Sequence, residues 1–334
     1  MAQMKYFYEL TVSSSPHVHT KVTTQTIMRD VLIALAPAMV GSVVFFGFRA
    51  LLVTLVSAAA CVFFEWAYCK IAKTNCKIYD LSAVVTGVLL AFVCPVTIPY
   101  WCIIIGDFFA IVVVKQLFGG LGRNIVNPAL AARAFMFSWP ALMTNWVKPG
   151  FSNAAGIFST ADAVTGATPL AAMSMGQLPE ASVQQMLLGN IGGCIGETSA
   201  LLLVAGLVYL LARKVISIRI PGVFIGTVAV LTVLFPQGND PITWMASQVF
   251  AGGLFLGAIF MATDYVTSPI TKLGQVIFAI GCGVLTVVIR YFGGYPEGVS
   301  YAILVMNICV VLLDRVGRPK KFGAPKKVKE VAKG

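Results

Sequence analysis

The sequence has 334 residues, of which 58% are hydrophobic and only 11% charged, and its mean hydropathy is +0.87. Soluble domains contain about 25% charged residues, so the composition excludes an ordinary soluble enzyme and favours a polytopic membrane protein. The formal net charge is +11, but the basic residues are placed as a membrane-topology signal, and no nucleic-acid partner is expected.

The first segment, residues 1–26, is polar and contains both histidines, His17 and His19. Two histidines separated by one residue do not form a metal site without further ligands. The segment also lacks the apolar core of a signal peptide. We therefore expect a cytoplasmic arm, with the chain inserting into the membrane through its own helices.

Ten apolar segments follow the arm, five on each side of a long polar loop. Helices are expected in them because backbone polar groups in lipid must be hydrogen-bonded within the spanning segment. The segments are 27–47, 51–69, 81–95, 99–117 and 128–143, then 193–212, 220–235, 245–262, 274–290 and 298–314. The predicted fold is all-α with about ten transmembrane helices. Its parts are a first membrane repeat at 27–143, an outer loop at 144–190, a second repeat at 191–314 and a basic cytoplasmic tail at 315–334.

Lysine and arginine set the expected orientation, because cytoplasmic loops carry an excess of them. With both termini in the cytoplasm, all but three of the 24 basic residues fall on the cytoplasmic side. The exceptions are Arg49, Lys148 and Arg290, whereas Lys115 and Arg133 count as cytoplasmic. This orientation places the loop at 144–190 on the outer face, and the basic tail also suits anionic lipid.

An internal repeat is visible, because residues 112–120 resemble residues 286–294 and both runs end in Phe-Gly-Gly. Each run closes the fourth segment of its half. Five segments per half is an odd number, so the halves are expected to be inverted, as in many transporters. The third and eighth helices should be interrupted, since the third runs into Pro95 and the eighth passes through Gly252.

Acidic residues in apolar segments are candidates for ion coordination, proton transfer or buried ion pairs. They are Glu65, Asp107 and Glu197 inside the segments, and Asp30, Asp80 and Asp264 near the ends. For Asp30 and Asp80 we favour an ion pair or a helix cap, and for the others both interpretations stay open. Asp264, Thr267 and Ser268 beside a helix break offer oxygen ligands for Na⁺, although no metal site is firmly predicted.

Several further residues have two possible roles. The eight cysteines form no C-x-x-C pair and lie mostly in apolar segments, which indicates buried thiols without a disulfide or an iron–sulfur cluster held by this chain alone. Asn124 and Asn127 offer amide groups to a flavin ring or staple a loop. Trp139 and Trp146 would anchor the membrane interface or, less simply, stack on a flavin.

The most informative stretch is Asp162-Ala163-Val164-Thr165-Gly166-Ala167-Thr168-Pro169 in the polar loop. Pro169 biases Thr168 toward extended backbone, which should present its hydroxyl group. No His or Lys lies near it in sequence to activate it. No catalytic residue is therefore predicted, and Thr168 is expected to accept a group attached by another enzyme. The alternative is a Thr-rich turn ahead of a proline.

This stretch resembles the flavinylation signature of the RnfD/NqrB family, the membrane subunits of Rnf ferredoxin:NAD oxidoreductases and of Na⁺-translocating NADH:quinone oxidoreductases. The resemblance extends to residues 15–17, 119–124 and 127–129 and is closer to the RnfD branch, because NqrB subunits usually carry a longer N-terminal extension. The family pattern usually has Gly where this chain has Ala163.

The resemblance implies that a flavin transferase joins FMN through its phosphate to Thr168, within a motif that includes Asp162, Thr165, Gly166 and Ala167. It also implies a non-covalent riboflavin, for which the sequence assigns no site. It further implies a multi-pass subunit of the bacterial cytoplasmic (inner) membrane, working with Rnf subunits A, B, C, E and G. Such a complex couples electron transfer between ferredoxin and NAD to Na⁺ or H⁺ translocation, and the subunit alone would be inactive. No G-x-G-x-x-G motif follows a strand, so partner subunits would handle these electron carriers.

Two other functions stay open. Inverted five-helix repeats with broken third and eighth helices also resemble the architecture of urea channels, so a channel or solute transporter without a redox role is an alternative. A riboflavin importer is a third possibility. The loop at 144–190 favours the flavoprotein, because a channel has no use for the motif that contains Thr168.

Overall fold

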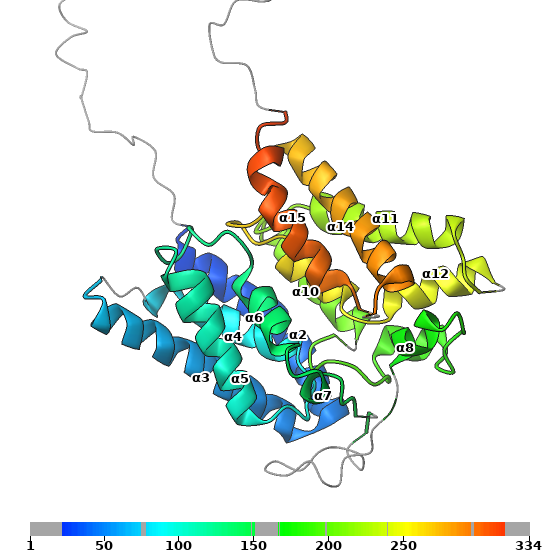
Figure 1. Cartoon of the computed structure of the whole chain (residues 1–334), viewed down its shortest axis with the longest axis horizontal. Coiled ribbons are helices and arrows are strands. Elements are labelled where there is room, and N and C mark those ends of the chain that lie inside the picture. The colour runs from blue at the N-terminus through cyan, green and yellow to red at the C-terminus, as the bar shows by residue number, and fades with distance from the viewer. Residues whose placement is uncertain are drawn as a thin grey trace, which may run out of the picture.

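The computed structural model describes residues 22–74, 78–147, 149–150, 166, 168–197, 199–238, 240–294 and 297–317. In this part of the chain the regular structure is helical and there is no β-strand. The helices of the first half lie together on one side of the molecule, and α11, α12, α14 and α15 lie together on the other (Figure 1). The fold is therefore all-α, as predicted.

Helices occupy all ten of the predicted apolar segments. In the first half they are α2 (Thr24–Phe46), α3 (Phe48–Ile71), α4 (Ser82–Phe92), α5 (Tyr100–Phe108) continued by the π-helix η2 (Phe109–Gln116), α6 (Pro128–Met136) and α7 (Pro140–Met143), with a 3₁₀ turn η1 (Ile78–Asp80) before α4. In the second half they are α10 (Ala200–Ala212), α11 (Arg219–Leu234), α12 (Pro241–Phe250), α13 (Leu254–Leu256), the π-helix η4 (Gly257–Met261), α14 (Lys272–Phe292) and α15 (Val299–Leu313).

Membrane-spanning character is clearest in the long helices. Helices α2, α3 and α14 are each long and apolar enough to cross a membrane, and α12 with the α13–η4 stretch would form a fourth, bent span. Helices α4, α10, α11 and α15 are apolar but shorter. The helices thus agree with an all-α membrane protein, while the inverted relation of the two halves stays a prediction.

Interruptions occur at both predicted positions. Helix α4 ends at Phe92 and an irregular, fully buried stretch follows at 93–98. Helix α12 and the α13–η4 stretch are bent by 60° at a break that includes Gly252, whose φ of 72° lies in the left-handed region that favours glycine. Each break frees backbone carbonyl groups in an apolar surrounding, where they need new partners.

Two buried arginines supply those partners. Arg49 of α3 donates from Nε to the carbonyl of Val96 at 2.8 Å and from Nη2 to that of Ile98 at 3.1 Å. Arg290 of α14 donates from Nη1 to the carbonyl of Gln248 at 2.5 Å and from Nη2 to that of Ala251 at 3.5 Å. Both arginines are exceptions to the predicted charge asymmetry, and the structure gives each of them a role at a helix break.

The helices differ from the predictions most clearly in three places. The sixth helix starts at Ala200 rather than at 193, because residues 191–197 form a buried irregular loop. Its amides at Ile195 and Gly196 donate to the carbonyls of Cys94 and Phe92. The fifth segment is divided into α6 and α7, and the polar loop contains two short helices, α8 (Pro169–Ser174) and α9 (Val183–Leu188). Hydrogen bonding between the irregular loops decides the first difference, and sequence periodicity contains no such signal.

Removal of either arginine at a helix break should destabilise the protein. We expect Arg49→Leu and Arg290→Leu each to lower the free energy of unfolding by about 2–4 kcal/mol, because each leaves two buried carbonyl groups without donors. Arg123→Leu is the control, since Arg123 is exposed, and should change it by less than about 0.5 kcal/mol. Thermal and denaturant unfolding of the purified protein in detergent measures this. Equal effects of all three changes would contradict the role of the breaks.

Candidate functional site

Thr168 lies at the start of helix α8, directly before Pro169. Its backbone is extended, with φ −75° and ψ 154°, as the following proline predicts. Its side-chain Oγ1 accepts a hydrogen bond from the amide of Ala171 at 3.2 Å, and the residue is only 9% exposed. The extended backbone is thus confirmed, but the hydroxyl oxygen also caps the start of a helix, which was not predicted.

Thr168 nevertheless has open space beside it, since it lines three neighbouring cavities. One is bounded by Arg133, Trp146 and Tyr301, and another by Glu197, Gly252 and Glu297. The third opens toward the surface near residues 177–181 and contains about 1360 Å³ of empty space, including its mouth. A group attached to Thr168 could thus extend toward the surface or toward the buried charges.

Arg133 is the centre of those charges. It lies on α6, is 2% exposed, and its guanidinium pairs with the carboxylate of Glu297 and, at 3.6 Å, with that of Glu197. Its Nη1 also donates to Ser300 Oγ at 2.6 Å, whereas its Nε is buried with no partner in the described part of the chain. A cation from the first half of the chain is thus held by acceptors from the second half.

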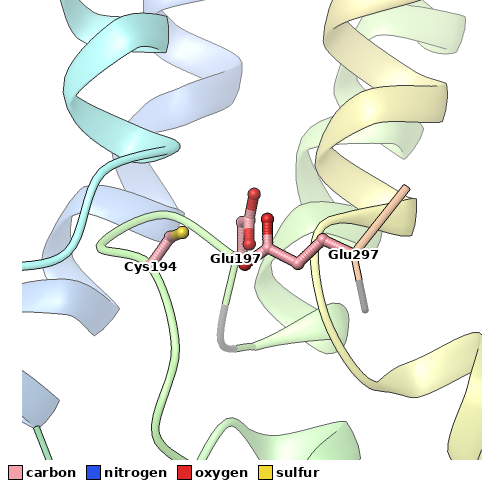
Figure 2. Close-up of side chains that lie close together, drawn as sticks. All are labelled: Cys194, Glu197 and Glu297. Carbon is pink, nitrogen blue, oxygen red and sulfur yellow. The ribbon is translucent and has the colours of Figure 1, made fainter. Parts of the chain in front are cut away.

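The carboxylates of Glu197 and Glu297 point toward one another, with the thiol of Cys194 nearby (Figure 2). One ligand atom from each of the three residues lies within 4.8 Å of the others, which is a spacing that a metal ion could use. Here, however, Arg133 already supplies the positive charge between the carboxylates. The arrangement is therefore a buried ion-pair cluster, in which each charge needs its partner.

The position of Arg133 corrects one of our sequence predictions. The charge asymmetry counted Arg133 on the cytoplasmic side and Thr168 on the outer side, yet the two residues line one cavity. Arg133 is a buried ion-pair partner and carries no information on topology. Lys115, also counted as cytoplasmic, is likewise buried, which weakens the charge asymmetry without reversing it.

A separate cavity lies between the two halves of the bundle and brings together candidate site residues that are distant in sequence. It is lined by the polar residues Lys115, Asn124, Asn127 and Asp264, and α2, α4 and η4 provide its apolar walls. Its empty space, including its mouth, is about 790 Å³. A cavity with apolar walls and a small number of polar groups is typical of a site that binds a small molecule.

The two asparagines also have structural roles in this region. Asn127 caps α6 through Oδ1 and donates from Nδ2 to the carbonyl of Met261 at 3.3 Å. Asn124 donates to the carbonyl of Val126 at 3.1 Å. The loop-staple interpretation is thus confirmed for both residues, while contact with a flavin stays a prediction.

The proposed sodium ligands are only partly brought together. Asp264 accepts a hydrogen bond from Thr267 Oγ1 at 3.1 Å, and its carboxylate also accepts the amide of Val266. Ser268 joins the turn through its backbone amide, which donates to the carbonyl of Asp264. These bonds close a turn, and the sodium site stays a prediction.

The remaining acidic residues divide into paired and unpaired groups. Asp30 pairs with Arg213 at 3.2 Å, and Asp80 accepts from Ser82, as expected for an ion pair and a local cap. Glu65 pairs with Lys115 at 3.0 Å. Asp107 makes no ion pair in the described residues and contacts a hydroxyl and a thiol.

Other predictions have mixed outcomes. Trp146 lines the cavity beside Thr168, whereas Trp139 packs edge-on against Trp101 and Phe135. The described cysteines carry free thiols and are Cys61, Cys69, Cys94, Cys102, Cys194, Cys282 and Cys309. The motif residues Asp162, Thr165 and Ala167 lie outside the described residues, as do His17 and His19.

The partners in these clusters were not predicted from the sequence as functional residues; they are Arg133, Lys115 and Glu297. A usable signal existed for two of them, because Lys115 and Arg133 lie inside apolar segments, where a basic residue is as unusual as an acidic one. Glu297 had no such signal, since it lies in the short connection between two helices.

Comparison with known proteins identifies relatives along the whole chain. Residues 11–323 match the family described as NQR2, RnfD, RnfE. The chain is 46% identical to the D subunit of the Na⁺-translocating ferredoxin:NAD⁺ oxidoreductase complex of Acetobacterium woodii, over 96% of this chain and 98% of that protein. It is 45% identical to the D subunit of the proton-translocating ferredoxin:NAD⁺ oxidoreductase complex of Clostridium ljungdahlii, over 94% and 96%. The D subunit of an ion-translocating oxidoreductase complex from Halorhodospira halophila is 39% identical over 93% and 94%.

Removal of the central cation should be far more harmful than removal of a peripheral one. We expect Arg133→Met to lower the free energy of unfolding by about 3–5 kcal/mol, because it removes the cation that pairs with the buried Glu197 and the partly buried Glu297. Arg123→Met is the control, since Arg123 is exposed, and it should cost less than about 0.5 kcal/mol. Adding Glu297→Gln to Arg133→Met should recover part of the loss, as a double-mutant cycle measures. A purely additive double variant would contradict the coupling.

Proposed function

The chain belongs to the NQR2, RnfD, RnfE family, and on that premise we propose that it is the RnfD-type membrane subunit of an Rnf complex. Such a complex couples electron transfer between ferredoxin and NAD to the translocation of Na⁺ or H⁺. Relatives that carry this description match almost end to end, which supports the same role as a translocase subunit. The observation that carries the proposal is the position of Thr168 between an opening to the surface and a buried arginine.

FMN joined through its phosphate to Thr168 is the first proposed cofactor. The residues fit it, because Oγ1 is fixed by the start of α8 and Arg133 is the only basic residue that the structure describes on the walls of these cavities. Charge-assisted hydrogen bonds favour an arginine beside a phosphate. Phe137, Trp146 and Tyr301 provide aromatic surface for a ring system. The flavin would supply the electron-carrying chemistry, and this chain would fix its position and surroundings.

Non-covalent riboflavin is the second proposed cofactor, and the cavity between the two halves is its proposed site. The amides of Asn124 and Asn127 would face the polar edge of the ring, and the apolar walls would hold its faces. Lys115 and Asp264 lie at the same cavity. Asn127 caps the start of α6, the helix that also carries Arg133, so one short helix would connect the two proposed flavin sites.

The proposed arrangement in the membrane follows the sequence. Ten helices would form two inverted repeats at 27–143 and 191–314 in the bacterial inner membrane. The loop at 144–190 would face outward, and both termini would be cytoplasmic. Rnf subunits A, B, C, E and G would be the partners, and a flavin transferase would modify Thr168 during maturation.

Intact-mass analysis of the denatured chain tests the covalent site. After co-expression with a flavin transferase, we expect a mass increase of one FMN less one water in the natural chain and none in Thr168→Val. Thr168→Ser keeps a hydroxyl group and the helix cap, so it should retain at least part of the modification. An unmodified natural chain would remove the main support for FMN on Thr168.

Extraction of non-covalently bound flavin tests the cavity between the two halves as the riboflavin site. We expect Asn124→Leu to reduce acid-extractable riboflavin by at least about tenfold, since a lost buried hydrogen bond and an added side chain together cost more than about 1.4 kcal/mol. The covalent FMN measured by mass should be unchanged. The control is Asn190→Leu, because Asn190 lines the surface cavity near Thr168 instead. Riboflavin lost equally in both variants would contradict the assignment.

A further inference from the structure

Asp107 is a buried carboxyl group that none of the proposed cofactors uses. It lies on α5, is 0% exposed, and its Oδ2 has no hydrogen-bond partner among the residues that the structure describes. Its Oδ1 lies 2.6 Å from Ser57 Oγ and 3.2 Å from Cys61 Sγ, both on α3. An ionised carboxylate in such surroundings is very costly unless it is paired or neutralised.

The two acceptors around the Ser57 hydroxyl favour a proton on Asp107. Ser57 Oγ lies 2.9 Å from the carbonyl of Gly87 as well as 2.6 Å from Asp107. A serine hydroxyl has one proton to donate, and a backbone carbonyl can only accept. If Ser57 donates to Gly87, the shorter contact needs a proton on Asp107. The carboxyl group then donates to Ser57, and both short contacts are satisfied.

Close packing of α3 and α4 creates this arrangement. A Cβ atom on Gly87 would lie 2.7 Å from the Cα of Ala58 and 2.8 Å from the carbonyl oxygen of Ser57. Only glycine therefore lets α4 approach closely enough for its carbonyl group to reach the Ser57 hydroxyl. The acceptor for that hydroxyl is fixed by the packing of two helices.

No cation in the packed elements that the structure describes compensates Asp107. The buried ionisable groups on α5, on the elements that pack against it and in the loop after α4 are Arg49, Cys61, Glu65, Cys69, Cys94, Cys102, Lys115 and Arg133. Arg49 donates to backbone carbonyls, and Lys115 and Arg133 pair with glutamates. Cys61 and Cys94 lie within electrostatic range of Asp107 but carry no positive charge.

A chain of polar contacts leads from Glu65, one helical turn of α3 beyond Cys61, toward the edge of the bundle. Cys61 and Glu65 are one helical turn apart on the same face of α3. From Glu65 the contacts continue through Lys115 to Ser82, at 3.0 and 2.6 Å, and from Ser82 to the half-buried Asp80 at 2.6 Å. Lys115 and Ser82 also line the cavity between the two halves, next to Asn124. A change of charge in that cavity would therefore alter the electrostatic potential at these contacts.

We propose that Asp107 is a proton-binding site in the interior of the bundle, one helical turn of α3 away from the polar contacts that run from Glu65 through Lys115 and Ser82 to Asp80. Sodium fits less well, because hard cations need several oxygen ligands and one neighbour of Asp107 is a thiol, a soft ligand. A role of this proton in ion translocation rests on the proposed function, whereas proton binding by Asp107 does not.

Infrared spectroscopy of the full chain in lipid nanodiscs tests proton binding without flavin or partner subunits. We expect a carbonyl-stretch band of a protonated carboxyl group at neutral pH, which disappears at high pH and is absent from Asp107→Asn. Ser57→Ala keeps Asp107 but removes its hydrogen-bond partner, so it should shift the band. This second variant remains informative if Asp107→Asn fails to fold. Asp240→Asn, at an exposed cap, should leave the band unchanged.

Two results would overturn the proposal. A band that is the same in the natural chain, Asp107→Asn and Ser57→Ala would mean that another group carries the proton. A band that is lost on addition of Na⁺ at constant pH would make Asp107 a sodium ligand instead. Because Thr168 has no part in the measurement, failure of FMN attachment would leave either result interpretable.

Discussion

Backbone carbonyl groups that a broken helix releases inside an apolar bundle must find donors, and the rest of this structure depends on that constraint. Arg49 and Arg290 meet it at the two breaks, each reaching across from a neighbouring long helix. Irregular backbone can then stay buried at 93–98 and at the bend of α12, which is tolerated at membrane depth only when the protein itself covers it. Because the two arginines hold these loops, the polar groups near both breaks keep fixed positions.

The two halves of the chain share one ion-pair cluster in the interior of the bundle. Arg133 on α6 meets Glu197 and Glu297 from the second half, and Asn127 at the start of α6 contacts the end of η4. Helix α6 therefore links the cavity beside Thr168 to the cavity beside Asn124. Such an arrangement resists sliding of one half against the other, because sliding would separate charges that cannot be solvated.

Much of the fold could be predicted, because apolar segments of membrane length are a strong signal. Pro95 and Gly252 also marked the breaks in advance. The site was predicted less completely: Thr168 was found through its motif, but its buried setting was not, since that depends on contacts with residues far along the chain. Glu297 is the clearest omission, because a lone acid in a short connection looks like any exposed residue until the fold places Arg133 beside it.

The two arginines at the breaks differ in whether their carbonyl acceptors are synthesised before or after them. Arg290 follows its acceptors Gln248 and Ala251 in the sequence, so they are already present when it leaves the ribosome. Arg49 precedes its acceptors at 96 and 98 by the whole of α3 and α4. During co-translational insertion α3 therefore enters the bilayer before its arginine has a carbonyl group to bind. Early assembly of the N-terminal half thus depends on how soon α4 and the loop after it arrive.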